Sequence, residues 1–115
     1  MAILAGHFNY RLTDNGNLTG EFANNQSTRP QTESADRMQE GNTELECKKF
    51  EGVYRSTWFE PDVKNALMMK LVITKKHGAE QIFRLEWLKH PSKSVLFKGE
   101  AMISEGLLVG NYWPA

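Results

Sequence analysis

The chain has 115 residues, with 14 basic and 14 acidic side chains and a formal net charge of zero. This length fits one domain over residues 1–115, and the balanced charge argues against nucleic acid or an anionic membrane surface as a partner. No apolar stretch approaches the roughly 20 residues that span a bilayer, and the single cysteine has no internal disulfide partner. The N-terminal residues also lack a basic start and a signal-length apolar run, so we expect a cytoplasmic protein.

The first expected element is a β-hairpin. Large apolar residues alternate over residues 3–13 and again over residues 18–24, and an Asp-Asn-Gly-Asn turn at 14–17 joins the two runs. Residues 25–42 differ from this pattern, because Met38 is their only large apolar residue. A polar stretch of this length predicts either a long loop, acting as a lid, or a short helix.

Strand patterns resume after residue 42 and continue to the end of the chain. They alternate with short turn signals, such as Pro61-Asp62 and His77-Gly78. The later strands are expected over residues 43–48, 50–60, 66–76, 80–89, 94–103 and 106–113. With the first hairpin, the sequence predicts eight strands.

One five-residue motif recurs within these strands: glycine at the centre, an apolar residue two positions before it and a second apolar residue two positions after it. Because strand side chains alternate with period two, the glycine and its apolar neighbours share one face. Glycine weakens a strand interior, but it relieves crowding where a sheet coils tightly. The motif therefore favours an all-β fold, an eight-stranded antiparallel up-and-down barrel, with an open β-sandwich as the alternative. The glycines concerned are Gly6, Gly20, Gly52, Gly99 and Gly110.

The same parity places amphipathic side chains inside the barrel, where their polar tips need partners. Ser56 lies between two such rings in the sequence, which is unusual for a purely apolar core. Large rings also fill plain barrel cores, so a filled core stays open as an interpretation, and Ser56 is the feature that favours a ligand pocket. The candidate ligand-binding residues from this pattern are Tyr10, Tyr54, Ser56, Trp58, Trp87 and Tyr112.

The outward face of the second half is unusually apolar for a monomer. A contiguous apolar patch on a soluble protein commonly marks an interface, so we expect a homo-oligomer, most simply a two-fold dimer. The alternative is that loop residues cover the patch. The candidate interface residues are Met68, Val72, Ile82, Leu96, Met102 and Val109.

No constellation of residues indicates catalysis. The histidines are scattered, and none has metal-ligand spacing from Cys47, so we expect no metal site and no cofactor. Cys47 lies beside two lysines that could lower its pKa, but it has no assignable histidine partner. Carboxylates near turns, such as Glu60, Asp62 and Glu105, show no sign of convergence. We therefore predict no catalytic residues.

Two segments resemble avidin-like barrels, and more broadly lipocalin-like ones. Residues 12–22 (LTDNGNLTGEF) resemble the early hairpin of avidin-like proteins. Residues 83–99, with Trp87 followed by a serine-bearing turn, resemble a later strand pair that carries a stacking tryptophan and ligand-contacting serines. The resemblance implies ligand contacts from Trp87 and Ser92, with Ser94 as a further candidate. The longer turn after Trp87 and the absence of the family's opening Gly-x-Trp argue against biotin.

The sequence therefore predicts a non-enzymatic barrel that binds a small, partly apolar ligand in its mouth. A filled barrel that acts as a protein association module is the alternative. An enzyme on a barrel scaffold ranks third.

Overall fold

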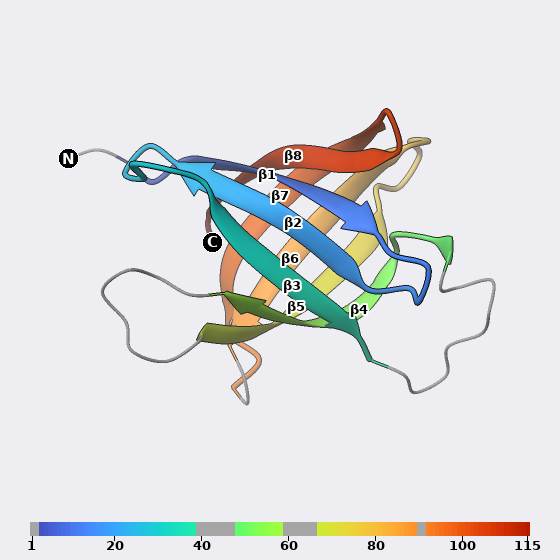
Figure 1. The fold of residues 1–115 in the computed structure, drawn as a ribbon, viewed down its shortest axis with the longest axis horizontal. Coiled ribbons are helices and arrows are strands. Elements are labelled where there is room, and N and C mark those ends of the chain that lie inside the picture. The colour runs from blue at the N-terminus through green and yellow to red at the C-terminus, as the bar shows by residue number, and fades with distance from the viewer. Residues whose placement is uncertain (1–2, 39–47, 59–66, 90–91) are drawn as a thin grey trace.

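The computed structural model describes residues 3–38, 48–58, 67–89 and 92–115, and in these it shows a closed antiparallel β-barrel (Figure 1). This confirms the predicted eight-stranded up-and-down barrel and excludes the open sandwich. The strands are β1 (Gly6–Leu12), β2 (Leu18–Asn24), β3 (Gln31–Arg37), β4 (Gly52–Trp58), β5 (Leu67–Lys75), β6 (Ile82–Lys89), β7 (Val95–Ser104) and β8 (Leu107–Pro114).

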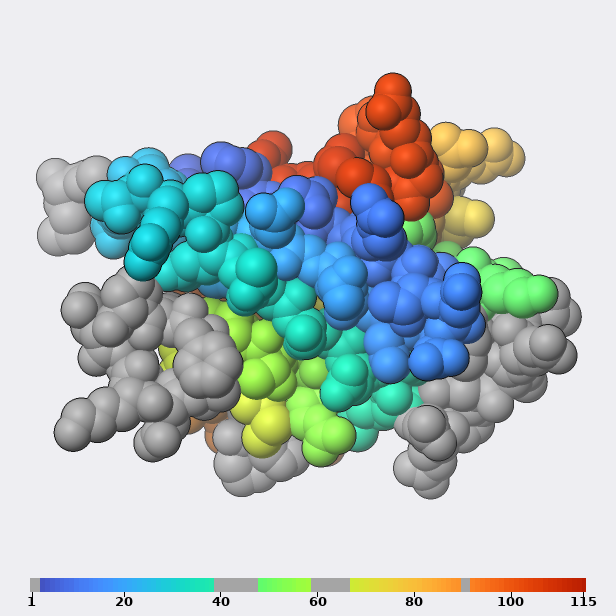
Figure 2. Space-filling model, viewed as in Figure 1, coloured from blue at the N-terminus to red at the C-terminus, as the bar shows by residue number. Residues whose placement is uncertain are grey.

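Each strand pairs with its neighbours in the sequence, and β1 pairs with β8 to close the barrel. The closing register sets Gly6 opposite Tyr112 and Tyr10 opposite Leu108. Closure leaves no strand edge unpaired within the sheet, which removes the template for edge-to-edge aggregation. In the space-filling view, β1, β2 and β3 run across the face toward the viewer, and the β7–β8 region projects at its upper edge (Figure 2).

The expectation of a loop or helix over residues 25–42 is wrong for Gln31–Arg37, which forms β3. This strand places Glu33, Ala35 and Arg37 inward, all buried. Its inward residues are polar or small, so hydrophobic alternation does not reveal it. The strand expected over 43–48 lies outside the described residues except for Lys48, which is not in a strand.

The five motif glycines face the barrel interior, as their parity predicts. A Cβ added at Gly99 would lie 3.1 Å from the Trp87 ring and 2.8 Å from the Asn111 carbonyl oxygen. At Gly110 it would overlap the Glu100 carbonyl oxygen and Ala101. These glycines therefore permit strands and interior rings to approach closely where the sheet coils.

One end of the barrel is closed by Arg37. Its guanidinium donates hydrogen bonds to the carbonyl oxygens of Gly16 (2.9 Å), Glu51 (2.9 Å) and Lys49 (2.5 Å). It also donates to the Tyr54 hydroxyl at 2.6 Å and lies 4.7 Å from the centre of that ring. A buried cation is tolerated when its donors are satisfied. Arg37 is thus a structural plug that ties β3 to the turn before β2 and to the segment before β4.

The outer surface carries the predicted interface residues in separate places. Ile82, Met102 and Val109 are aligned across β6, β7 and β8, and Met102 is 56% exposed. Arg84 and Glu100 form the next outward-facing pair along β6 and β7. The remaining three, Met68, Val72 and Leu96, lie elsewhere on β5 and β7. The described residues include no helix with the length and apolar character needed to cross a membrane.

Candidate functional site

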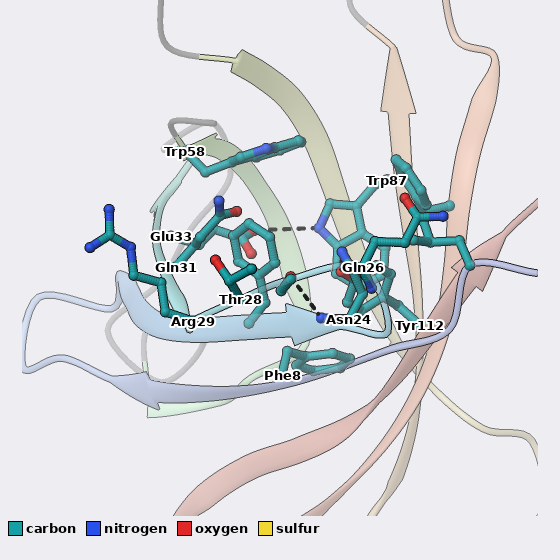
Figure 3. A pocket seen from close by; sticks show the side chains of 14 residues that line it. Phe8, Asn24, Gln26, Thr28, Arg29, Gln31, Glu33, Trp58, Trp87 and Tyr112 are labelled. Atoms are coloured by element: carbon teal, nitrogen blue, oxygen red, sulfur yellow. Dashed lines mark hydrogen bonds between the residues drawn. The ribbon is translucent and has the colours of Figure 1, made fainter. Parts of the chain in front are cut away.

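The barrel end opposite Arg37 holds a cavity of about 630 Å³. This is the end at which both termini lie, on the left in Figure 1. Its walls come from the inward residues of most strands and from the β2–β3 connection, and Figure 3 shows them converging. The lining residues are Leu4, Phe8, Phe22, Asn24, Gln26, Ser27, Thr28, Arg29, Gln31, Glu33, Trp58, Trp87, Phe97 and Tyr112.

Six of the lining side chains are aromatic, and they contact one another around the cavity. Tyr112 lies at the centre of this wall, with ring centroids 6.1 Å from Trp87, 6.0 Å from Phe97 and 6.3 Å from Phe22. Phe22 in turn meets Trp58 at 6.2 Å, edge to face. Tilted and edge-to-face arrangements are the favourable geometries for such rings. The wall is consequently a connected, pre-formed apolar surface.

Glu33 lies at the inner end of this cavity and is buried. Three side chains donate hydrogen bonds to its Oε2 atom: the Tyr10 hydroxyl at 2.7 Å, the Ser56 hydroxyl, and Trp87 Nε1 at 3.4 Å. They come from β1, β4 and β6, so the carboxylate links strands on several sides of the barrel. These bonds fix the carboxylate while it still lines the cavity.

Burial shifts the pKa values of both Glu33 and Tyr10. Desolvation raises the pKa of the Glu33 carboxyl, and the hydrogen bonds from Ser56, Tyr10 and Trp87 lower that pKa only in part. Burial likewise raises the pKa of Tyr10 well above its usual value, and the adjacent Glu33 charge raises it further. Tyr10 therefore stays a hydrogen-bond donor, and Glu33 is an acid that an incoming ligand could influence.

The structure distributes the predicted ligand residues over four places. Trp58, Trp87 and Tyr112 line the cavity. Tyr10 and Ser56 lie beneath it, fully buried, and reach it only through Glu33.

The other predicted contacts lie away from the cavity. Tyr54 is at the closed end, where its hydroxyl accepts from Arg37 and donates to the Phe50 carbonyl oxygen. Ser92 and Ser94 are exposed in the turn after β6, 3.5 Å apart. The structure thus places these serines, which the resemblance implied as ligand contacts, outside the described cavity wall.

Sequence reasoning missed Glu33, which has the most central position in the site. It lies in the polar segment that was expected to be a loop or helix, so no inward direction was assigned to it. The alternation of Glu33, Ala35 and Arg37 with Thr32, Ser34 and Asp36 is a period-two pattern, but one without large apolar residues. Strand counting gave no signal for it either, because the strand expected over 43–48 already completed the predicted eight.

The described residues contain no group of three or more histidine, cysteine, aspartate or glutamate side chains placed to hold a metal ion. Cys47, Glu60 and Asp62 lie outside the described residues, and Glu105 is exposed in the β7–β8 turn. No family model, curated protein or solved structure matches the chain.

Proposed function

We propose that the protein binds a small, partly apolar ligand in the open end of its barrel and does not transform it chemically. The observation that carries this proposal is a buried carboxylate at the inner end of a cavity walled by six aromatic rings. Ligand pockets commonly combine such apolar walls with a few fixed polar groups. A cavity of about 630 Å³ also falls in the usual range for small-molecule sites.

Binding without catalysis is supported by the few ionisable groups at the cavity. Of the described lining residues, only Glu33, Arg29 and Tyr112 ionise. Arg29 extends away from Trp87 and Tyr112 in Figure 3, and it is exposed. Acid–base catalysis commonly uses two groups positioned on the same substrate, and the described wall offers a single buried carboxylate.

The proposed setting is that of a cytoplasmic, avidin-like or lipocalin-like binding barrel. In this proposal the β2–β3 connection acts as part of a lid, since Gln26, Ser27, Thr28 and Arg29 all line the cavity. Within the same polar segment, Gln31–Arg37 forms β3, a wall of the barrel.

Tryptophan fluorescence tests this proposal, because two tryptophans line the cavity and Trp113 lies outside it, 41% exposed. A panel of small planar compounds is titrated into the wild type and into Trp87→Leu and Trp113→Leu. We expect saturable quenching in the wild type and in Trp113→Leu, with binding weakened at least about tenfold in Trp87→Leu. Equal loss in both variants, or no quenching by any compound, would count against a ligand site in the barrel mouth.

A second proposal is that two copies associate through the outer surface of β6, β7 and β8. The aligned row of half-buried Ile82, exposed Met102 and half-buried Val109 supports it, since an apolar patch that reaches the surface is typical of an isologous interface. Met102→Glu should then yield a folded monomer by light scattering, with Thr74→Glu, on an exposed position of β5, as the control. An unchanged mass in Met102→Glu would reject this surface.

A further inference from the structure

We infer that the ligand is an organic cation: an ammonium or related group that meets Glu33, attached to a planar apolar group that lies among the aromatic rings. This inference rests on the proposed ligand site at the open end and adds the charge and shape of the ligand. It is carried by the position of Glu33, whose carboxylate lines the cavity from its inner end.

The hydrogen bonds on Glu33 indicate an acceptor that is held ready for a partner. Tyr10, Ser56 and Trp87 all donate to Oε2, and none of these three bonds reaches Oε1. Donors converging on one oxygen favour the ionised carboxylate and fix its plane. The second oxygen is then available to a donor that enters through the mouth.

The charge around Glu33 favours a cation over a neutral donor. Among the described residues the single ion pair joins Lys76 to Glu100 on the outer surface, so no described lysine or arginine neutralises Glu33. A buried charge is costly unless it is paired. A bound cation would supply the missing counter-charge, and binding would offset the desolvation that the carboxylate already bears.

The walls favour the same class of ligand. Aromatic faces attract cations through their quadrupole, and tryptophan does so most strongly. Trp58 and Trp87 line the cavity together with Glu33 (Figure 3). Trp58 is the cross-strand partner of Glu33, and the Trp87 indole donates a hydrogen bond to it. An ammonium at the carboxylate would therefore also lie near ring faces, and an attached planar group would pack against the remaining rings.

The groups that face Glu33 set the pH dependence. Tyr10 from β1 titrates far above neutrality, since burial raises its pKa. Tyr112 from β8 and Arg29 from the β2–β3 connection line the same cavity. The other neighbours do not titrate.

These neighbours are Ser56 on β4, Trp87 on β6, Trp58 opposite Glu33 on β4, and Gly20 opposite it on β2. Affinity for a cation should consequently rise as the pH increases through the raised pKa of Glu33.

Three compounds of similar shape and different charge test the inference: phenethylamine, 2-phenylethanol and 3-phenylpropionate. Each is titrated by calorimetry into the wild type, into Glu33→Gln and into Glu21→Gln. The amide introduced by Glu33→Gln would keep an acceptor for the three donors. Glu21, which is exposed on the outer face of β2, loses the same charge in the control variant. Ligands of this size in a well-formed site bind with a Kd on the order of millimolar or tighter.

The expected result is binding of phenethylamine at least about tenfold tighter than 2-phenylethanol in the wild type and in Glu21→Gln. Glu33→Gln should reduce this ratio to near one. In the wild type, the phenethylamine affinity should also rise as the pH increases through the raised pKa of Glu33, since an alkyl ammonium stays charged well above neutral pH, while the alcohol affinity stays flat. This pH series keeps the test decisive if Glu33→Gln does not fold.

Two outcomes would overturn the inference in distinguishable ways. Binding of the alcohol or the propionate as tightly as the amine, with loss in Trp87→Leu, would leave the ligand site standing and reject its preference for cations. A preference for the amine that persists in Glu33→Gln would reject the role of Glu33. Absence of binding by all three compounds would reject the inference, and silence of the wider fluorescence panel would then reject the site as well.

Discussion

The two ends of this barrel each bury one charged residue of β3, and they use it differently. Arg37, at the closed end, donates to three backbone carbonyl oxygens and to the Tyr54 hydroxyl, all within 2.9 Å. Glu33, at the open end, is held by side chains alone and borders a cavity. A charge with its hydrogen bonds supplied by the backbone is a structural element, whereas a charge fixed on one side and accessible on the other is suited to binding.

The largest expected effect is the loss of stability when the Arg37 guanidinium is removed from the closed end. Arg37→Ala leaves buried carbonyl oxygens without donors and opens a void, so we expect a loss of about 3–5 kcal/mol in the free energy of unfolding. Urea denaturation measures it. Arg55→Ala, at an exposed position on neighbouring β4, should change stability by about 0.5 kcal/mol or less. A cost below about 1 kcal/mol for Arg37→Ala would show that the plug is dispensable.

Gly99→Ala tests the packing behind the open end. Its new methyl group would press on the Trp87 ring and on the Asn111 carbonyl oxygen. Overpacking of this kind costs about 1–3 kcal/mol. Thermal unfolding gives the loss, and ligand titration should show weakened binding because Trp87 is displaced. Unchanged stability and affinity would mean that the sheet relaxes freely there.

Tyr10 and Tyr54 provide a matched pair of hydroxyl deletions, one for each end. Tyr10→Phe removes one buried hydrogen bond and Tyr54→Phe removes two, so the changes should cost about 0.5–3 kcal/mol of stability, with the larger loss in Tyr54→Phe. Tyr10→Phe should also alter affinity for a cavity ligand, since it frees the Glu33 carboxylate. Tyr54→Phe should leave affinity unchanged, because its partners are Arg37 and the Phe50 carbonyl oxygen. Equal effects on affinity would contradict the separation of the two ends.

The smallest expected effect is the dependence of stability on pH. Burial raises the pKa of Glu33 in the folded state above the usual 4.5. The folded protein therefore holds this proton at pH values where the unfolded chain has released it, and the free energy of unfolding falls as pH rises. The contribution is complete below the unfolded-state pKa and is lost as pH passes through the folded-state pKa. Chemical denaturation across this window should show a slope that is absent from Glu33→Gln.

The architecture could be predicted because the glycine motif and the apolar alternation are local signals. The inward direction of Gly99 and Gly110 follows directly from side-chain parity, whereas their contacts with Trp87 and Ala101 depend on the strand register. Trp58, Trp87 and Tyr112 were found for the same reason, since large inward rings are visible in a period-two pattern.

The core of the site could not be predicted in this way. Glu33 is buried through hydrogen bonds from Tyr10, Ser56 and Trp87, which lie 23 and 54 residues away in the chain. Hydrogen bonds from residues so distant in the chain allow a polar side chain to be buried, and the hydropathy pattern of the sequence does not reveal them. Tyr54 was grouped with the ligand residues because parity fixes the face of a strand but not the end of the barrel that a side chain serves.

The most direct test of the account is a crystal structure of the protein with phenethylamine bound. The account predicts the ammonium nitrogen within hydrogen-bond distance of the Glu33 carboxylate and the phenyl ring between Trp58 and Trp87. An ammonium left in solvent with Glu33 contacting only its protein neighbours, or a mouth closed by side chains, would contradict it.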